Sequence, residues 1–349
     1  MKGGSVTKNL LIVIGNGFSI DLAQQLDNKR INLSNLFENG DRVPWPADGT
    51  PGFLSKSYCP ELWKLGARAN MNADLAGKLI EDIITCANVS ASSTRQTINS
   101  ECSNVYIRAY HELVSYLKYL FIFYNNEIKD DELKRILDNE WGWGSLIKNA
   151  YENEDIESIT IITYNYDIFL ERILHLLNLE FQMVGFDTNS SKLRLIKPHG
   201  SISFRSKRTT VRDSFSIKYN RDSLGGGIED LIVDEEVDFE NISSINTMIP
   251  PSGESERYKL MWASTLREEV KETVNTMTED DDVIFGGLSY CNVDRPEIDS
   301  IITGLSVDTN VKIINPNTNN TFVAVVSSVF DQYIHYTSTE IIGGLYRND

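Results

Sequence analysis

The sequence has few of the residues from which metal sites and disulfide frameworks are built. Its 349 residues include four cysteines and four histidines. The cysteines form no CxxC pair and have no closely spaced histidine beside them: Cys59, Cys86, Cys102 and Cys291. This spacing predicts neither a zinc motif nor a disulfide framework. We therefore expect no metal ion, and we expect the chemistry to be carried by organic side chains.

Basic residues and long apolar runs are also scarce. The 50 Asp and Glu residues outnumber the 33 Lys and Arg residues, for a formal charge of -17, so the surface repels nucleic acids and anionic membranes. The longest membrane-like segment, 119–124, is far too short to span a bilayer. The apolar run after Lys8 is too short for a signal peptide. We expect a cytoplasmic protein that holds any anionic ligand with local donors such as helix N-termini.

The segment 9–23, NLLIVIGNGFSIDLA, dominates the N-terminal region. Five apolar residues, Leu10 to Ile14, run into Gly15-Asn16-Gly17, which indicates a buried strand closed by a tight turn. Ser19 is placed to cap the helix that follows, and the first N–H groups of that helix could then face a phosphate across the glycines. The same residues also fit a turn that needs small side chains for packing alone.

Apolar segments alternate with helical patterns along the rest of the chain. This alternation predicts an α/β fold with an open, mostly parallel, Rossmann-like sheet and helices on both of its faces. The predicted strands are 10–14, 158–163, 193–196, 282–285 and 311–314. The chain then divides into a first βα unit at 1–31, a large, mostly helical insertion at 32–155 and the remainder of the sheet domain at 156–349.

Two segments outside the predicted sheet have patterns of their own. In the insertion, apolar residues recur at helical spacing from Leu75 to Cys86 and from Tyr106 to Tyr124, the second being either core or a subunit interface. The segment 213–246, with three glycines and the acidic run 229–240, is expected to be a mobile surface excursion whose charge is solvated.

Polar side chains follow each predicted strand, where ligands bind in open α/β sheets. Taken singly they are weak signals, because Asn165 and Asp167 could cap the next helix and His199 could be a turn residue. Together they are expected to lie at one edge of the sheet. The motifs are GNGFS at 15–19, TYNYD at 163–167, KPHGS at 197–201, GGLS at 286–289 and INPN at 314–317.

As a set, and in this order, these motifs resemble the sirtuin-like domain family over about 1–30 and 156–320. GNGFS is similar to the family's glycine-rich phosphate loop, TYNYD to its Thr-x-Asn-x-Asp element and KPHGS to its His-Gly element. GGLS resembles its second phosphate turn, and INPN the segment at the adenosine ribose. The resemblance implies an NAD site, with Asn165, His199 and Asp167 in catalysis. The residues it implies for NAD binding are Gly15, Asn16, Gly17, Phe18, Ser19, Asp21, Thr163, Gly287, Ser289 and Asn315.

The departures from this family narrow the expectation. The chain has no four-cysteine zinc module of the kind that sirtuin deacylases hold, and the insertion is also unlike theirs. It more closely resembles the divergent bacterial branch that hydrolyses NAD in anti-phage defence. The dehydrogenase fingerprint GxGxxG is incomplete, because Ile20 stands at its third glycine.

The resemblance therefore implies a regulated, NAD-depleting hydrolase that releases nicotinamide and ADP-ribose. In this mechanism Asn165 holds a water molecule and the ribose, and His199 accepts a proton. Two alternatives stay open: a protein deacylase that uses the same NAD site, and a catalytically silent subunit that binds NAD or ADP-ribose. Control is expected through a homo-oligomer or a partner such as an ATPase subunit, docked on the stripe from Tyr106 to Tyr124.

Overall fold

The fold is built on a parallel sheet, as the sequence predicts. The computed structural model describes residues 7–26, 30–91, 104–207, 215–219, 226–239, 247–249, 261–290, 295–316 and 319–347. All pairings in its seven-stranded sheet are parallel, in the order β3-β4-β2-β1-β7-β8-β9. The strands are β1 Lys8–Ile14, β2 Ile156–Thr163, β3 Phe181–Met183, β4 Leu193–Ile196, β7 Asp282–Gly286, β8 Asn310–Ile314 and β9 Tyr333–Tyr336. A second, two-stranded sheet pairs β5 Phe204–Ser206 with β6 Leu231–Val233.

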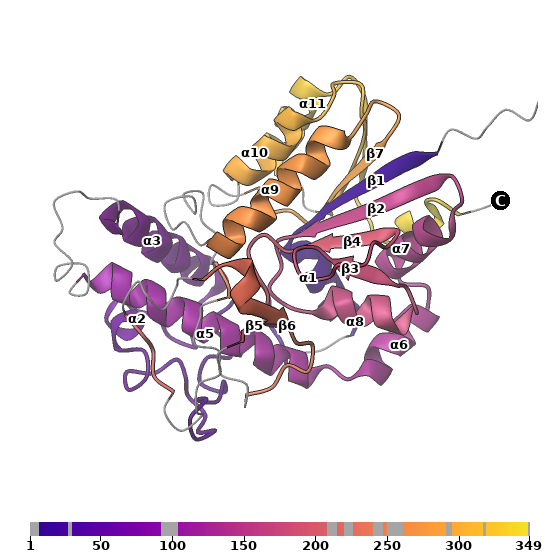
Figure 1. Ribbon diagram of the computed structural model, residues 1–349. Coiled ribbons are helices and arrows are strands. Elements are labelled where there is room, and N and C mark those ends of the chain that lie inside the picture. Colours follow the sequence, from indigo (N-terminus) through magenta and orange to yellow (C-terminus); the bar gives the residue numbers. More distant parts are fainter. Residues whose placement is uncertain are drawn as a thin grey trace, which may run out of the picture.

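Helices cover both faces of the large sheet, which confirms the predicted architecture. Figure 1 shows α9, α10 and α11 gathered on one face and α1, α7 and α8 on the other. None of the helices in the described ranges is long and apolar enough to cross a membrane. The helices are α1 Asn16–Gln25, α2 Pro60–Lys64, α3 Ala73–Ala91, α5 Val105–Glu127, α6 Asp130–Asp138, α7 Gly142–Glu152, α8 Phe169–Leu176, α9 Met261–Thr276, α10 Arg295–Gly304 and α11 Asn320–Val329, with short 3-10 turns η3 Ile228–Asp230 and η5 Ile342–Gly344.

All five predicted strands are present, and the sequence pattern missed two edge strands. β3 has only three residues, and β9 begins at Tyr333, where the sequence pattern predicts the end of a helix over 323–333 and the start of a polar tail. The helix α11 ends earlier, at Val329. An edge strand contacts one neighbour only and needs no continuous apolar run. In β9, Ile334 is 52% exposed, so this strand lacks the apolar pattern by which the central strands were recognised.

The strand register brings the predicted motifs to one edge. Ile14 at the end of β1 pairs with Thr163 on one side and with Gly286 on the other. Gly286 in turn pairs with Ile314. The chain leaves β1 toward β2 and β4, and leaves β7 in the opposite direction toward β8 and β9, so the strand order reverses between β1 and β7. Ligands bind at such a reversal, beyond the carboxyl ends of the strands.

The part of the helical insertion that forms α2, α3 and α5 lies at this carboxyl edge of the sheet, whereas α7 packs on β2 (Figure 1). The α5 stripe is core, since Tyr110, Leu117 and Tyr124 are all buried within the chain itself. These side chains are therefore not available to a second subunit, and the expected docking on this stripe is wrong. Packing on both α2 and α3 explains the long apolar pattern of α5.

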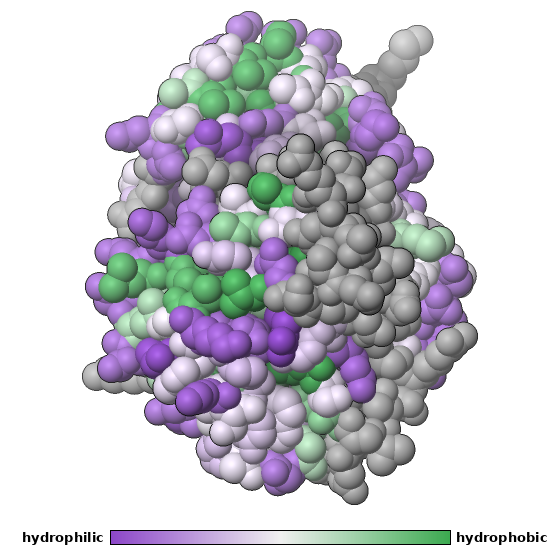
Figure 2. Space-filling view, turned by 90° about the vertical axis from the view of Figure 1, so that its left-hand side faces the viewer, coloured by the Kyte–Doolittle hydropathy of each residue, from purple (hydrophilic) through white to green (hydrophobic). Residues whose placement is uncertain are grey.

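The predicted buried stripe of α3 is also partly wrong. Leu75 is 56% exposed, whereas Ala76, Ile83 and Ala87 face the core. Figure 2 views the left-hand side of Figure 1, where α3 lies, and shows hydrophobic side chains at the surface there. Ile83 of the predicted stripe is thus buried as expected, and Ala76 and Ala87 share its packed face, whereas Leu75 lies outside it.

The segment predicted as a surface excursion, 213–246, is packed in its described parts. Residues 231–233 form β6, and the ring of Phe239 stacks on Tyr119 of α5 with their centroids 6.0 Å apart. Phe215 contacts the same tyrosine edge-on. The prediction of a solvated segment followed from its acidic composition and did not consider its two phenylalanines, which pack on α5. The polar stretch 90–103, whose sequence predicts an exposed connection, lies mostly outside the described residues.

A buried histidine in α5 gives the first prediction. Burial lowers the pKa of His111 from 6.5 to about 4. Between these pH values the unfolded chain binds a proton that the folded chain does not, so the free energy of unfolding falls as the pH falls. When the pH falls from 7 to 5, the free energy of unfolding should fall by about 2 kcal/mol less in His111→Leu than in the wild type. Urea unfolding at both pH values measures this. The exposed-site variant His335→Gln is the control, and equal losses in wild type and His111→Leu would contradict the prediction.

Candidate functional site

A cavity of about 110 Å³ lies beyond the carboxyl ends of β1, β2, β4 and β7. Six of the predicted site residues line it: Gly15, Asn16, Asn165, Asp167, His199 and Ser289. The sequence did not indicate the rest of its wall, which is mostly apolar or aromatic: Leu36, Phe121, Tyr164, Tyr166, Leu288 and Ile298. Leu36 and Phe121 belong to the insertion, which therefore closes the site.

Asn165 is held by two hydrogen bonds from its amide nitrogen. Nδ2 donates to the main-chain oxygen of Gly15 and to Ser19 Oγ, both at 3.1 Å. Ser19 Oγ donates in turn to Asp167 Oδ2 at 2.8 Å. Both amide hydrogens of Asn165 are thus used by the fold, and Oδ1 is the atom of this side chain left to meet a ligand.

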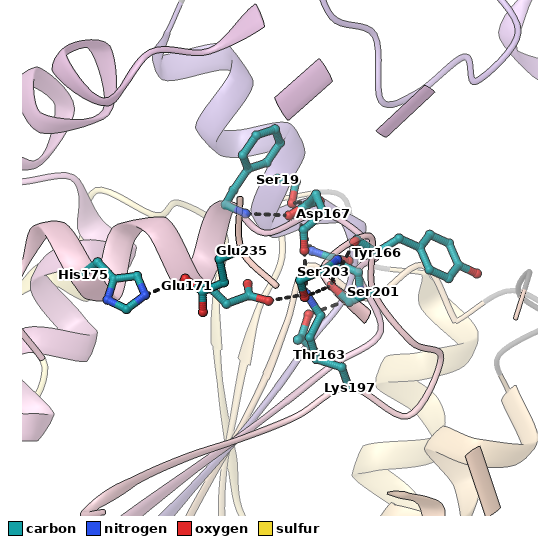
Figure 3. A network of polar contacts seen from close by, with 12 residues as sticks. Ser19, Thr163, Tyr166, Asp167, Glu171, His175, Lys197, Ser201, Ser203 and Glu235 are labelled. Atoms are coloured by element: carbon teal, nitrogen blue, oxygen red, sulfur yellow. Dashed lines mark hydrogen bonds and ion pairs between the residues drawn. The ribbon is translucent and has the colours of Figure 1, made fainter. Parts of the chain in front are cut away.

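A fully buried lysine lies behind Asp167. Lys197 Nζ donates to the main-chain oxygen of Asp167 and to Glu171 Oε1, both at 2.6 Å. The side chains of Lys197 and Glu171 have no exposed surface. Burial raises the pKa of both Asp167 and Glu171, and the nearby Lys197 charge opposes that rise. Figure 3 shows the ammonium group between α8 and the turn after β2, where it fixes that turn.

His199 is placed between a carboxylate and an aromatic ring. Its Nε2 lies 2.7 Å from Glu297 Oε2 of α10. The Tyr164 ring meets the imidazole edge-on, with centroids 4.8 Å apart. The other oxygen of Glu297 accepts from Arg267 Nε of α9 at 3.0 Å. The His199 side chain is 1% exposed, so the imidazole is almost completely shielded from bulk water.

The glycine turn is determined by packing. A Cβ added to Gly17 would lie 2.5 Å from Gly287 Cα and 2.8 Å from its oxygen. Gly17 N donates to Gly287 O at 2.9 Å, and Phe18 N donates to Gly15 O. These two N–H groups of α1 are therefore already bonded within the protein. Of the two explanations that the sequence left open, close packing accounts for Gly17.

Ser19 does not cap α1, contrary to the prediction. The helix begins at Asn16, with Gly15 as its N-cap, and Ser19 is buried inside the first turn. Its hydroxyl is bonded to Asn165 and Asp167, so it does not reach a phosphate in this structure. Asn16, the first residue of α1, is exposed and donates to Leu33 O. Together with Gly15 it lines the cavity.

Phe18 and Asp21 point away from the cavity. Phe18 is fully buried, and its ring contacts Trp141 and Trp143 at centroid distances of 5.2 and 5.7 Å. Asp21 accepts from Trp141 Nε1 at 2.6 Å and from Thr339 Oγ1 at 3.0 Å. Both residues attach α1 to neighbouring segments, and neither lines the cavity.

Three further predicted residues support the cavity from outside. Thr163 Oγ1 accepts from the main-chain N–H of Asn165 at 3.2 Å. Gly287 has a φ of +60°, which suits its close approach to Gly17. Asn315 Nδ2 donates to Leu288 O at 2.9 Å and so holds the turn after β7. In the described ranges, no three His, Cys, Asp or Glu side chains gather in a group that could hold a metal ion.

Sequence reasoning missed the charged residues behind the site. Lys197 stood in a quoted motif, but lysine after a strand gave no reason to expect complete burial. Glu171 follows Asp167 at the i+4 spacing of a helix face, which was a usable signal. Glu297 lies in α10, the helix after β7, but outside the motif that ends at Ser289. Arg267 lies in α9 and contacts Glu297 where α9 packs on α10. No local pattern predicts that contact.

The Gly17 contact predicts a stability effect. Gly17→Ala places a methyl group against the main chain of Gly287, which has no flexible end to give way, and should cost about 1–3 kcal/mol or more. Gly77→Ala is the matched control, since open space surrounds this exposed position in α3, and it should stabilise by up to about 1 kcal/mol. Denaturant unfolding of both variants measures the difference. A neutral Gly17→Ala would show that packing does not require the glycine.

The buried ion pair gives a third prediction. Lys197→Met leaves the buried Glu171 carboxylate unpaired and should cost about 3–5 kcal/mol in unfolding free energy. The double variant Lys197→Met/Glu171→Leu removes both charges and should recover much of that loss. Lys271→Met breaks the exposed pair with Glu268 and should cost less than about 1 kcal/mol. Equal effects of the two single variants would contradict a buried, charged pair.

The comparison with known proteins adds no family to this geometry. No family model matches the chain, and no curated protein matches it. The function must therefore be argued from the cavity and from the residues that converge on it.

Proposed function

We propose that this chain hydrolyses NAD to nicotinamide and ADP-ribose in the cavity at the β1–β7 reversal. One observation carries the proposal. Asn165 and His199 follow two different strands, yet both line one cavity together with the exposed Asn16 and Ser289. A buried base and an oriented amide beside a solvent-reaching rim suit attack of water on a substrate that enters from the surface.

The reaction requires few groups. The bond between the nicotinamide nitrogen and ribose C1′ breaks, and nicotinamide leaves with the electron pair. Asn165 Oδ1 accepts a hydrogen bond from the attacking water, whose oxygen bonds to C1′. His199 takes the proton that this water loses. Phe121, Leu288 and Ile298 form apolar walls that exclude other water molecules from the reacting centre.

The cavity is too small for the whole proposed substrate, so only one end of NAD would enter it. A site for a whole drug-sized ligand has about 300–1,000 Å³, whereas this cavity has about 110 Å³. We propose that the nicotinamide end enters it, because Asn165 and His199, the residues assigned to the chemistry, line this cavity. The two phosphates and the adenosine lie outward along Asn16 and Ser289, because Ser19 is bonded inside the fold. The wider biological part of the proposal, a regulated NAD-depleting defence effector, rests on the family resemblance of the motifs.

Two substitutions test the chemistry. Asn165→Ala and His199→Ala should each lower nicotinamide release by on the order of 10²-fold or more. Release is measured by chromatography on purified protein supplied with NAD. The controls are Asn126→Ala and His175→Ala, which replace the same residue types at exposed positions away from the cavity. His199→Ala at the wild-type rate would show the proposed mechanism to be wrong.

A second measurement separates catalysis from binding. Because Asn165 also bonds Gly15 O, the melting temperature of each variant is recorded with and without NAD. Retained thermal stabilisation by NAD, together with lost turnover, assigns the residue to the chemical step. If the wild-type chain binds NAD but releases no nicotinamide, it is a silent binding subunit. Release that depends on an acylated peptide would identify a deacylase.

A further inference from the structure

We infer that Glu297 is the positioning residue of His199. It holds the imidazole in one orientation and in the tautomer protonated on Nε2, so that Nδ1 is the nitrogen that accepts a proton. The catalytic consequence rests on the proposed function, whereas the tautomer does not depend on it. No motif of the sequence includes this residue, since Glu297 lies in α10, eight positions beyond the end of the GGLS motif at Ser289.

The contact is short and its carboxylate is fixed. His199 Nε2 and Glu297 Oε2 lie 2.7 Å apart, and Arg267 donates to Glu297 Oε1 at 3.0 Å. The Glu297 side chain is 18% exposed and that of Arg267 is 20% exposed, so both charges reach solvent while the imidazole does not. A carboxylate held from its far side presents one oxygen to the ring in a constant direction.

The second nitrogen determines the tautomer. His199 Nδ1 is buried and has no hydrogen-bond partner among the described residues. A proton on Nδ1 would be a buried donor without an acceptor, whereas a proton on Nε2 is donated to a carboxylate. The form protonated on Nε2 is therefore favoured. Its Nδ1 lone pair is shielded from bulk water, and His199 is one of the residues that line the cavity.

The surrounding groups hold this arrangement from both sides. The Tyr164 ring packs edge-on against the imidazole, opposing its rotation away from Glu297. When Nδ1 accepts the proton of the attacking water, the resulting imidazolium keeps its Nε2–H bonded to the Glu297 carboxylate. That negative charge stabilises the imidazolium, as in other carboxylate–histidine pairs, and Arg267 limits the effect by its own positive charge.

Nuclear magnetic resonance tests the tautomer without any enzymatic assay. The chain has four histidines, and ¹⁵N-histidine labelling makes their ring nitrogens visible; the signals missing in His199→Gln identify residue 199. In the wild type, Nε2 of His199 should show the shift of a protonated nitrogen and Nδ1 that of an acceptor. Glu297→Ala should give a mixture of tautomers, while Glu297→Gln, whose side-chain oxygen can still accept, should restore the wild-type form. An unchanged tautomer in Glu297→Ala would overturn the inference.

Kinetics test the consequence for catalysis. Glu297→Ala should lower kcat for nicotinamide release by on the order of 10–100-fold with little change in KM, and Glu297→Gln should recover part of it. Arg267→Met removes only the outer contact and should have a smaller effect, and Glu272→Ala, at an exposed position of α9, is the control. If Arg267→Met is as damaging as Glu297→Ala, the pair merely joins α9 to α10. An increase in kcat would show that Glu297 restrains His199, and would equally overturn the inference.

The two tests fail separately. If the wild type releases no nicotinamide, the proposed function fails, and the tautomer measured by NMR still decides whether Glu297 positions His199. If the wild type is active and Glu297→Ala keeps both its kcat and its tautomer, the proposed function stands and the role of Glu297 is rejected.

Discussion

The site depends on one buried ammonium group. Lys197, directly after β4, donates to the main chain of Asp167 and to Glu171, and so ties the end of one strand to the turn after its neighbour. Asp167 accepts a hydrogen bond from the Ser19 hydroxyl, and the hydroxyl oxygen accepts one from the Asn165 amide. A buried charge of this kind is costly unless every partner is in place. The orientation of Asn165 is therefore coupled to the folding of three separate segments.

The parts of this fold that the sequence predicts are those with a local physical signature. β1, β2, β4, β7 and β8 are short apolar runs buried on both faces, and their parallel pairing brings the polar residues that follow them to one edge. That argument placed Asn165 and His199 at one cavity. The edge strand β9 has no such run, and α3 buries Ala76, Ile83 and Ala87 but leaves Leu75 exposed, so helical spacing alone did not locate its packed face.

The glycine turn shows why a motif does not determine a role. Gly15-Asn16-Gly17 suits phosphate binding and close packing equally well as a sequence. In the folded chain, Gly17 lies against the main chain of Gly287 and its N–H is already bonded there. The local pattern could not reveal this, because Gly287 is 270 positions away (287 minus 17). Under the proposed function, the phosphate groups of the dinucleotide are assigned further out, to Asn16 and Ser289.

The two halves of the site come from opposite sides of the strand reversal. β2 and β4 supply Asn165 and His199, which stay aligned through Lys197 and Ser19. The later part of the chain supplies Glu297, which contacts His199, and Arg267, which donates to Glu297 where α9 packs on α10. His199 thus comes from the β2–β4 side of the sheet, and the carboxylate that contacts it comes from α10 on the other side. A displacement of α10 relative to the sheet would leave the cavity residues of the first half in place while removing the carboxylate that meets Nε2 of His199.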